Sequence, residues 1–386
     1  MKAILNYRTH IVSSLSEIGQ PAWDGLLALQ GELNPFLSYA FLHALHESGS
    51  ATPETGWQPQ YIALYDGDAS SGETLAAALP LYVKDHSYGE YVFDWAWADA
   101  YQRHGLDYYP KLLAAIPFTP VAGPRLLARD PQARAALIEV LVATQGAAGV
   151  SSTHVLFPPQ EHARQLRDAG FMLRSGVQFH WLNRGYASFD EFLATLEQKK
   201  RKNIRAERRK VAQAGVTLRR VRGVDALDAD WVLFNRCYRH TYAAHHSTPY
   251  LNLEFFRRIG KAMPENILLV IAERAGRPIA ASLVIHTADT LYGRYWGELE
   301  HVPCLHFEAA YYQPLEFCIE QGIGSFEGGA QGEHKMARGF LPTRTYSAHW
   351  LAHPAFADAI ERFLEREAGG IDEYMSELNE RNPFRG

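Results

Sequence analysis

The chain has 386 residues, of which 47% are hydrophobic and 21% are charged. This composition is typical of a globular protein, and the length allows two domains at roughly 150 residues each. The 38 Lys and Arg residues against 43 Asp and Glu residues give a net charge of -5, which excludes a globally basic nucleic-acid-binding protein. Any contact with nucleic acid must therefore be local.

The three cysteines, Cys237, Cys304 and Cys318, are far apart in the sequence and lie in apolar surroundings. This spacing indicates free thiols in a reducing compartment, and neither a disulfide framework nor a zinc site. No apolar run approaches the ~18 residues of a membrane span, and the N-terminus lacks the hydrophobic core of a signal peptide. We therefore expect a cytoplasmic protein with no membrane span and no metal site.

The hydrophobic pattern of the first half predicts strands interspersed with helices. Strands are expected at 9–18, 61–65, 75–83, 88–95, 153–157 and 171–182. Helices are expected at 24–29, 38–47, 108–116, 131–144 and 161–169. Pro80 interrupts the apolar run 75–83, so a bulge or an edge strand is predicted there.

The second half is expected to begin with a long basic helix over 189–214. Strands are predicted at 216–221, 267–272, 279–287, 290–298 and 345–351, with a short strand just before the glycines at 328 and 329. Helices are predicted at 226–244, 252–263, 306–321 and 354–367, the third interrupted at Pro314. The turn residues 275–278, which include Gly and Pro, predict a hairpin between the second and third strands.

Three short patches stand at junctions between these elements. They are Asn-Pro-Phe-Leu-Ser-Tyr-Ala-Phe-Leu at 34–42, Lys-Lys-Arg-Lys-Asn-Ile-Arg-Ala-Glu-Arg-Arg at 199–209, and Ala-Arg-Gly-Phe at 337–340. The first resembles the aromatic-plus-serine motif of Fem proteins, the second their Arg-x-Asn-Ile-Arg motif, and the third their Lys-Gly-Phe. The order of elements in the second half resembles the acyltransferase fold called GNAT, and the first half resembles a looser copy of it.

A tandem of two such domains, with a basic helix opening the second, resembles the Fem family of peptidoglycan-bridge aminoacyl ligases. More narrowly, the chain resembles the FemAB-like N-acyltransferase group of peptidoglycan biosynthesis/recognition, nearly end to end. The resemblance implies an α/β (α+β) fold of two GNAT-like domains, 1–184 and 185–386, with mixed, mainly antiparallel sheets flanked by helices. It also implies an active cleft between the halves.

In the GNAT fold two central strands part, and their free backbone groups bind an acyl donor and stabilise the oxyanion. Acetyl-CoA enzymes of this fold usually add a Gln/Arg-x-x-Gly-x-Gly/Ala loop whose amides hold the pyrophosphate. The corresponding segment here, 298–307, contains no glycine, and Gln102–Asp107 in the first half matches only the first two fixed positions. The donor therefore stays open between an acyl-CoA and an aminoacyl-tRNA or carrier-bound acyl group, and no tightly bound cofactor is expected.

The stretch 325–340 is rich in glycine and in side chains that bind ligands or exchange protons. Its glycines are Gly328, Gly329 and Gly332, and its polar residues include Gln331, Glu333, His334, Lys335 and Arg338. Glycine is used where the backbone needs a positive φ or a close approach. The composition suits a ligand-binding loop and also a solvated turn.

Acyl transfer to an amine requires a group that takes a proton from the nucleophile. The candidates are Glu333 and His334 in the glycine-rich loop, followed by His306 and Glu308 at the start of the helix 306–321. An acidic residue in the first turn of a helix also suits the macrodipole alone, so Glu308 has an ordinary explanation. Gln331, Lys335 and Arg338 are candidates for binding substrate, the two cations through a carboxylate or phosphate.

An aromatic and acidic patch follows the strand expected at 88–95. We expect its members Trp95, Asp99, Tyr101 and His104, together with Trp296 of the second half, to bind the acceptor. Aromatic side chains of this kind also serve as core packing, and that alternative stays open.

Residues 199–210 include eight Lys or Arg residues and one acid, Glu207. The candidates for binding a phosphate backbone are Lys199, Lys200, Arg201, Lys202 and Arg205. Such a stripe would contact a tRNA or a nucleotide-bearing donor and would give affinity without reading bases. A solvated face of an amphipathic helix is the alternative.

The residues and the resemblance together predict an N-acyltransferase that moves an acyl or aminoacyl group to an amine of a small molecule, peptide or cell-wall precursor. The donor would be an acyl-CoA or an aminoacyl-tRNA, so tRNA is an expected partner in the second case. Two other classes remain: a non-catalytic binding protein that recognises a cell-wall or peptide ligand, and an RNA-binding protein without turnover.

Overall fold

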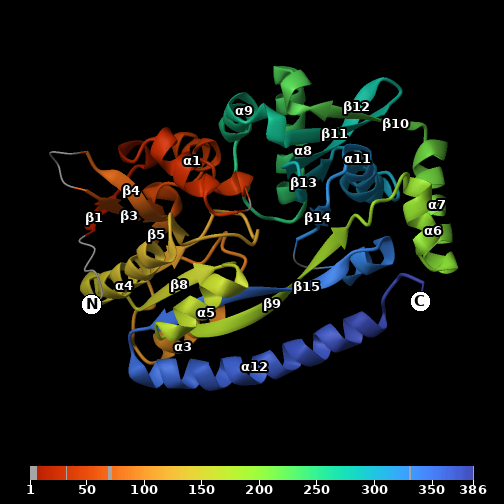
Figure 1. Ribbon diagram of the computed structural model, residues 1–386. Coiled ribbons are helices and arrows are strands. Elements are labelled where there is room, and N and C mark those ends of the chain that lie inside the picture. The colour runs from red at the N-terminus through yellow and green to blue at the C-terminus, as the bar shows by residue number, and fades with distance from the viewer. Residues whose placement is uncertain (1–6, 32, 68–71, 330–331, 386) are drawn as a thin grey trace. The chain divides into compact units, whose positions relative to one another are not determined.

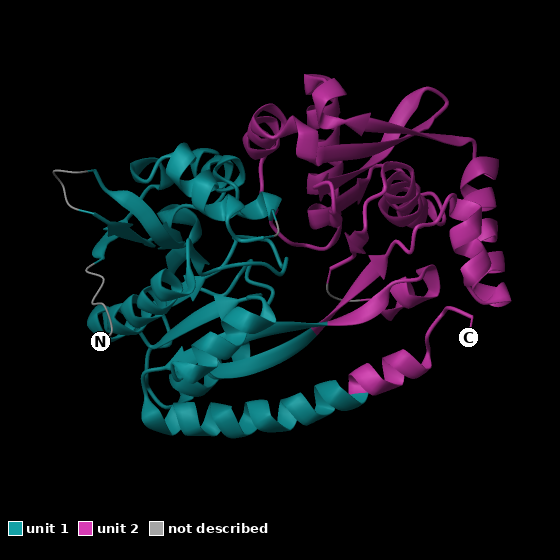
Figure 2. Cartoon of the chain, in the orientation of Figure 1, with its two compact units in different colours: residues 1–176, 344–373 teal, residues 177–343, 374–386 magenta. Residues whose placement is uncertain are grey.

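The computed structural model describes residues 7–31, 33–67, 72–329 and 332–385. The chain forms two compact units, one of residues 1–176 and 344–373 and the other of 177–343 and 374–386 (Figure 2). Both are mixed α/β with mainly antiparallel strands flanked by helices, which confirms the expected fold class. The division differs from two continuous halves split at 184, because residues 347–351 pair with a strand of the first unit and bring 344–373 into it.

The first unit contains two sets of strands (Figure 1). One is a four-stranded sheet in the order β1 (Arg8–Val12), β3 (Tyr61–Asp66), β4 (Thr74–Leu79), β7 (Leu127–Ala128). The other has the order β2 (Trp57–Pro59), β5 (Leu81–Lys84), β6 (Lys111–Ala114), β8 (Ser152–Leu156), and then the C-terminal part of β15 (Leu341–Leu351). The helices are α1 (Gln20–Ala28), α2 (Tyr39–Glu47), α3 (Trp95–Arg103), α4 (Pro131–Ala148) and α5 (Gln160–Asp168).

The strands of the second unit follow the order β10 (Val216–Arg222), β11 (Ile267–Arg274), β12 (Arg277–His286), β13 (Thr290–Glu298), β14 (Ser325–Glu327), and then the C-terminal part of β9 (Met172–Leu182). Its helices are α6 (Phe189–Thr195), α7 (Gln198–Gln213), α8 (Asp228–Ala244), α9 (Leu253–Ala262), α10 (Leu305–Phe307) and α11 (Gln313–Gln321). A π-helical turn, Glu308–Tyr312, joins the last two. β9, β15 and α12 (Pro354–Glu380) each run from one unit into the other.

The two units share a topology. In each, antiparallel strands are followed by one parallel pair whose members are joined through a helical connection: β6 and β8 in the first unit, β13 and β14 in the second. This repetition confirms the expected tandem arrangement. Among the described residues no helix is long and apolar enough to cross a membrane.

Several expected elements differ from the structure. Residues 88–94 form no strand, because Gly89 and Tyr91 have positive φ angles that break an extended run, and α3 begins at Trp95. Residues 111–114 form β6 and not a helix, since they pair with β5 and β8 in a buried sheet. The helix expected over 189–214 is broken at Leu196, which is extended and bridges to Phe384.

A buried ion cluster ties β6 to the loop before α3. The Lys111 ammonium donates to Glu90 at 2.8 Å and to Asp94 at 2.5 Å, and Tyr108 also donates to the Asp94 carboxylate. The Lys111 side chain is 0% exposed and the two carboxylates are 2% and 3% exposed. Removing one partner of a buried ion pair leaves a buried charge without compensation, so this cluster is sensitive to single substitutions.

We expect Lys111→Met to lower the free energy of unfolding by about 3–5 kcal/mol, because Glu90 and Asp94 remain buried without their cation. Urea denaturation measures this change. The matched control is Arg103→Met, which breaks an exposed pair with Asp99 and should cost about 0.5 kcal/mol or less. Equal effects of the two substitutions would contradict the assignment of a stabilising role to the buried cluster.

Candidate active site

The strands β13 and β14 part after a short stretch of pairing. Thr290, Leu291 and Tyr292 pair in parallel with the three residues of β14. β14 then ends, whereas β13 continues to Glu298. Within the described part of the chain, no strand pairs with β13 on its β14 side beyond Tyr292.

A bulge in β13 changes the register of the strand at the same point. Val284 of β12 faces Gly293, and the preceding Leu283 faces Tyr295, so Arg294 is the extra residue of β13. A bulged residue is left out of the ladder, and its strand bends. The backbone of Arg294 therefore lies outside the pairing with β12, beside the end of β14. Polar backbone groups in this position suit the oxygen of a reacting carbonyl.

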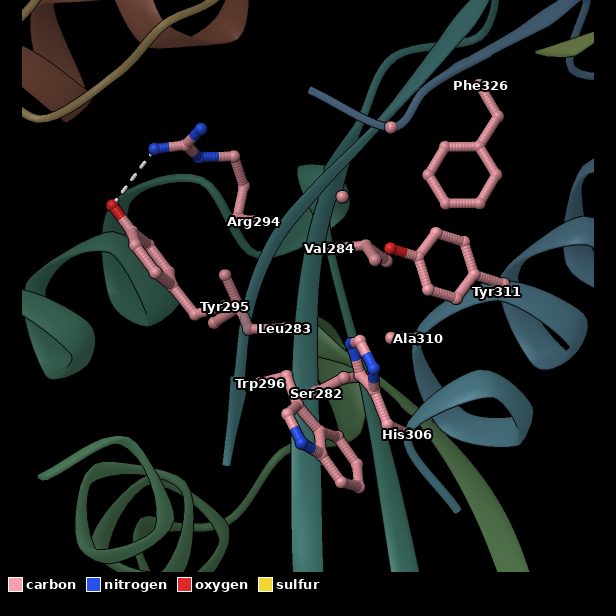
Figure 3. Close-up of a pocket in the computed structure, with 12 residues that line it drawn as sticks. Ser282, Leu283, Val284, Arg294, Tyr295, Trp296, His306, Ala310, Tyr311 and Phe326 are labelled. Carbon is pink, nitrogen blue, oxygen red and sulfur yellow. Dashed lines mark hydrogen bonds between the residues drawn. The ribbon is translucent and has the colours of Figure 1, made fainter. Parts of the chain in front are cut away.

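A cavity of about 100 Å³ opens between the parted strands (Figure 3). It is lined by Ser282, Leu283, Val284, Gly293, Arg294, Tyr295, Trp296, His306, Ala310, Tyr311, Phe326 and Gly328. A water molecule needs about 10–15 Å³ of such space, so the cavity has room for a small reacting group. The Arg294 guanidinium donates to the Tyr295 hydroxyl at 3.1 Å at one side of the cavity.

His306, a sequence candidate for the base, lies on the cavity wall. Its ring centroid is 5.4 Å from that of Trp296, a sequence candidate for binding the acceptor, and 5.5 Å from that of Tyr311. Burial is the main cause that lowers the pKa of the His306 imidazole to about 4, and the positive groups of the loop 334–338 act in the same direction. The imidazole is therefore uncharged at neutral pH and able to accept a proton.

The glycine-rich loop contributes Gly328 to the cavity. The Gly328 amide donates to the Phe179 carbonyl of β9 at 2.9 Å, and a Cβ at this position would lie 3.0 Å from that oxygen and from the Phe340 ring. Glycine is required there because the loop runs directly against backbone and core. Gln331, expected to bind substrate, lies outside the described residues.

The two loop residues proposed as bases have different surroundings. Glu333 is exposed, accepts from Tyr374 and pairs with Arg381 at 3.1 Å, and it does not line the cavity. His334 is exposed and its ring lies 5.8 Å from Phe307 and 6.1 Å from Tyr311. Burial, followed by the charges of the adjacent cations, lowers the pKa of His334. The structure thus brings neither side chain into the cavity.

The cations of the loop are buried. Lys335 donates to the Gly329 carbonyl at 3.2 Å, and burial lowers the pKa of its ammonium to about 8. Arg338 donates to both carboxylate oxygens of Glu207 in α7 at 3.0 and 2.8 Å, and its guanidinium lies 3.5 Å from the Phe307 ring centroid. Tyr312 donates to the same carboxylate. Arg338 therefore ties the loop to α7, with its charge already engaged.

Glu308, another sequence candidate for the base, is held in a second clamp. Arg208 of α7 donates to its two oxygens at 3.1 and 3.0 Å and to Glu316 at 2.6 Å, and Gln313 donates to Glu308 at 2.8 Å. The Glu308 side chain is 5% exposed. A carboxylate paired in this way stabilises the turn between α10 and α11, and both of its oxygens are already engaged.

The acceptor candidates of the first half lie on α3 and at its end. Trp95 is exposed against Tyr88, Asp99 pairs with Arg103 on the surface, and Tyr101 is buried against Phe356. His104 donates through Nδ1 to the Ala100 carbonyl at 2.8 Å.

The sequence Gln102–Gly105 is the C-terminal end of this helix, where the partial charge is negative, so it is unsuited to a phosphate.

Some cations of the basic helix α7 are paired or bonded to carbonyls, and others are exposed. Arg201 donates to the carbonyls of Ala194 and Leu196, and Arg205 pairs with Asp190 at 2.8 Å. Lys200 is half-buried. The exposed cations without an ion pair among the described residues are Lys199, Lys202, Arg209 and Lys210.

Sequence reasoning missed four polar residues of the cavity: Ser282, Arg294, Tyr295 and Tyr311. A glycine inside a strand is a signal of a bulge, and Gly293 directly precedes Arg294. The π-helical turn that presents Tyr311 has no comparable signal in the sequence.

Parted strands and a bulge in a repeated mixed sheet are the features expected of a GNAT-like fold. The chain belongs to the FemAB-like family, described as peptidoglycan biosynthesis/recognition, whose model matches residues 14–386. A search of the curated proteins found no significant match.

Solved structures with the same fold include FemX, with a TM-score of 0.54 and 11% identity over 92% of this chain and 100% of that one. L-PGS from Bacillus licheniformis has a TM-score of 0.50 and 10% identity over 91% of this chain and 97% of that one. At an identity this low, the similarity shows only that the fold is shared.

We expect Arg338→Met to lower the free energy of unfolding by about 2–4 kcal/mol, because Glu207 loses a bidentate partner in a largely buried site. Urea denaturation of the single variant, of Glu207→Gln and of the double variant gives the coupling between the two side chains. Arg205→Met, which breaks an exposed pair, is the control and should cost about 0.5 kcal/mol or less. A loss for Arg338→Met as small as the control's would show that the pair of Arg338 and Glu207 does not stabilise the fold.

Proposed function

We propose that this protein is an N-acyltransferase that moves an aminoacyl group from an activated ester to an amine of a peptide or cell-wall precursor. The observation that carries the proposal is the parting of β13 from β14 beside the uncharged His306. The family description and the FemX fold support a cell-wall substrate. An activated aminoacyl ester is available in the cytoplasm, so we place the reaction there.

The chemistry follows from the cavity. The carbonyl of the donor enters between the parted strands, where the backbone of β13 beyond its pairing with β14 stabilises the oxygen as negative charge develops. The attacking amine must lose a proton, and His306 is the neutral acceptor on the wall. The Trp296 ring lies beside the His306 ring, with centroids 5.4 Å apart and an angle of 41° between the planes.

The surroundings favour an aminoacyl-tRNA as the donor over an acyl-CoA. The segment that would hold a pyrophosphate, between β13 and α10, contains no glycine and carries Glu298 and Glu300. Its last residue before α10, Cys304, makes no side-chain cap. A loop without glycine is less able to hold a diphosphate on closely approaching amides, whereas the exposed lysines of α7 attract a phosphate backbone.

A second hollow, of about 410 Å³, lies beside the same helix. It is lined by Arg208, Arg209, Val211, Ala212, Val216, Leu218, Glu308 and Gln313. The volume is in the range of small-molecule sites, roughly 300–1,000 Å³. The segment 305–313 lines both this hollow and the cavity, so a terminal nucleotide in the hollow would be held by the element that carries His306.

Transfer assays test this function. Purified protein is incubated with a lysine-containing cell-wall peptide and either tRNA charged with labelled amino acids or labelled acetyl-CoA, and the peptide is analysed by mass spectrometry. We expect an amide-linked residue with charged tRNA only. Acetylation from acetyl-CoA would overturn the donor assignment, and retention of the peptide without any transfer would favour a non-catalytic binding protein.

We expect His306→Ala to lower kcat/KM by about 10²–10⁴-fold without loss of folding, as removal of a general base does. The exposed His301, replaced by Ala, is the control and should leave the rate within about twofold. Since the neutral imidazole is the active form and its pKa is about 4, the acid limb of kcat/KM should inflect near this value. An inflection near 6.5, the value of an ordinary histidine, would assign the base to another group.

Reversing two exposed charges of α7, Lys199→Glu with Lys202→Glu, should weaken binding of charged tRNA by at least about 10-fold. The slope of log affinity against log salt concentration should fall by about 1.5, since each neutralised phosphate contributes about 0.7–0.9. Fluorescence anisotropy at several salt concentrations measures both. Arg239→Glu with Lys261→Glu makes the same charge change on α8 and α9. An equal loss there would indicate a nonspecific charge effect.

A further inference from the structure

The loop between β6 and β7 in the first unit contains a buried cation without a counter-ion. Arg125 is 0% exposed. Among the described residues its guanidinium donates to the carbonyls of Val121 at 2.6 Å and Gly123 at 3.0 Å, and to no carboxylate. Its Nε is buried and has no hydrogen-bond partner in this part of the chain. A buried charge without an opposite charge costs free energy, so an anion bound here would stabilise the loop.

Gly123 allows two hydrogen-bond donors to meet in this loop. Its φ lies outside the left-handed region, so glycine is needed there for space. A Cβ on Gly123 would lie 2.3 Å from the Asn34 side-chain nitrogen and 3.6 Å from the Arg125 Nη1. The Gly123 amide donates to the Phe157 carbonyl at 3.0 Å, which holds the loop against the segment before α5. Because Gly123 is only half-buried, the Arg125 guanidinium lies just beneath the surface at this point.

Arg134 of α4 and His162 of α5 extend the cluster. The half-buried Arg134 makes only long hydrogen bonds within the described residues, to the Leu126 carbonyl at 3.4 Å and to Gln30 at 3.5 Å. His162 is 6% exposed, and its Nδ1 has no partner in the described chain. Burial lowers the pKa of His162 to about 3, and the charges of Arg134 and Arg125 act in the same direction. The uncharged imidazole therefore lies near both guanidinium groups.

The cluster carries an excess of positive charge. Burial lowers the pKa of Arg134, and Glu161 and Asp130 oppose this effect from a distance without an ion pair to Arg134 among the described residues. Asp130 pairs instead with Arg129 at 3.0 Å, and Glu161 is exposed. Burial lowers the pKa of Arg125 to about 9, so this guanidinium stays charged at neutral pH. Two charges match a phosphate monoester, which carries about −1.5 to −2 at pH 7, better than a single carboxylate.

We propose that Arg125, Arg134 and His162 form a binding site for a phosphate group in the first unit. The two guanidinium groups hold the anionic oxygens, which they fit as planar forks. The Nδ1 of His162 completes its hydrogen bond on a phosphate oxygen, and the anion reaches Arg125 beside Gly123. The ligand is free phosphate or the phosphate group of a larger molecule such as a nucleotide. The site does not depend on the transfer reaction.

The alternative is that Arg125 serves only to hold the carbonyls of its own loop. Arg125→Met would destabilise the protein in either case, so this variant does not separate the two roles. Arg134→Gln does, because Arg134 is half-buried and makes no ion pair among the described residues, so the fold is kept. The matched control is Arg164→Gln, which removes the same charge from an exposed position on α5.

The test is calorimetric titration of the whole protein with inorganic phosphate, at constant ionic strength in chloride. We expect saturable binding that Arg134→Gln weakens by at least about 10-fold, as the loss of a charge-assisted hydrogen bond does. Arg164→Gln should change the affinity by less than about twofold. Hydrogen exchange locates the site: phosphate should slow the exchange of amides in 121–126 and 157–163.

ADP and UDP, titrated in the same way, identify the source of the phosphate. Affinity at least about 10-fold above that of inorganic phosphate assigns the site to the phosphate group of a larger ligand, and equal affinity assigns it to free phosphate. The proposal is overturned if none of the three binds saturably, if both substitutions weaken binding equally, or if the two segments gain no protection. Circular dichroism checks that both variants are folded.

Discussion

The contact between Phe326 and Gly293 keeps the strands of the second unit apart. Phe326 is fully buried, and a Cβ on Gly293 would lie 3.1 Å from its ring, so the ring needs the space that glycine leaves. The Phe340 ring meets the same ring edge to face, with centroids 5.0 Å apart. Because β14 ends one residue after this wedge, the loop turns away at Gly328 and the bulged part of β13 faces a cavity and not a neighbouring strand.

The charges of α7 explain how the other wall of the cavity is held. Its inner face carries Glu207 and Arg208. Glu207 accepts hydrogen bonds from Arg338 and Tyr312. Arg208 donates to Glu308 and Glu316. These contacts fix both ends of the turn that carries Tyr311. The outer face carries the exposed lysines. One basic run thus has a structural face and a solvent face, and substitution of an inner residue changes the packing of the site together with the charge of the helix.

The sequence was informative where local pattern decides the structure. Pro80 was recognised as an interruption of the run 75–83, but the expected bulge or edge strand was wrong, because the proline separates β4 of one sheet from β5 of the other and neither strand is at an edge. His306 and Trp296 were named from the sequence and line the cavity. The segment 108–116 was misread because Leu, Ala and Lys favour helices, whereas burial between two strands decides for β6. Glu333 and Glu308 were plausible bases until their partners were known, and Arg381 and Arg208 lie 48 and 100 residues away. No local pattern reveals such pairs.

The parallel pairs of the two units show why one of them carries the site. In the first unit β6 stays paired with β8 to its last residue, Ala114, which faces Val155. Side chains fill the space beside it: His154 meets His349 at 2.7 Å, and Tyr108 connects the imidazole to the Lys111 cluster. In the second unit the same topology loses its pairing after Tyr292, and the polar groups beside it, His306 and Tyr311, face a cavity. Closed pairing makes buried polar groups structural, whereas parted strands leave the equivalent groups available to a substrate.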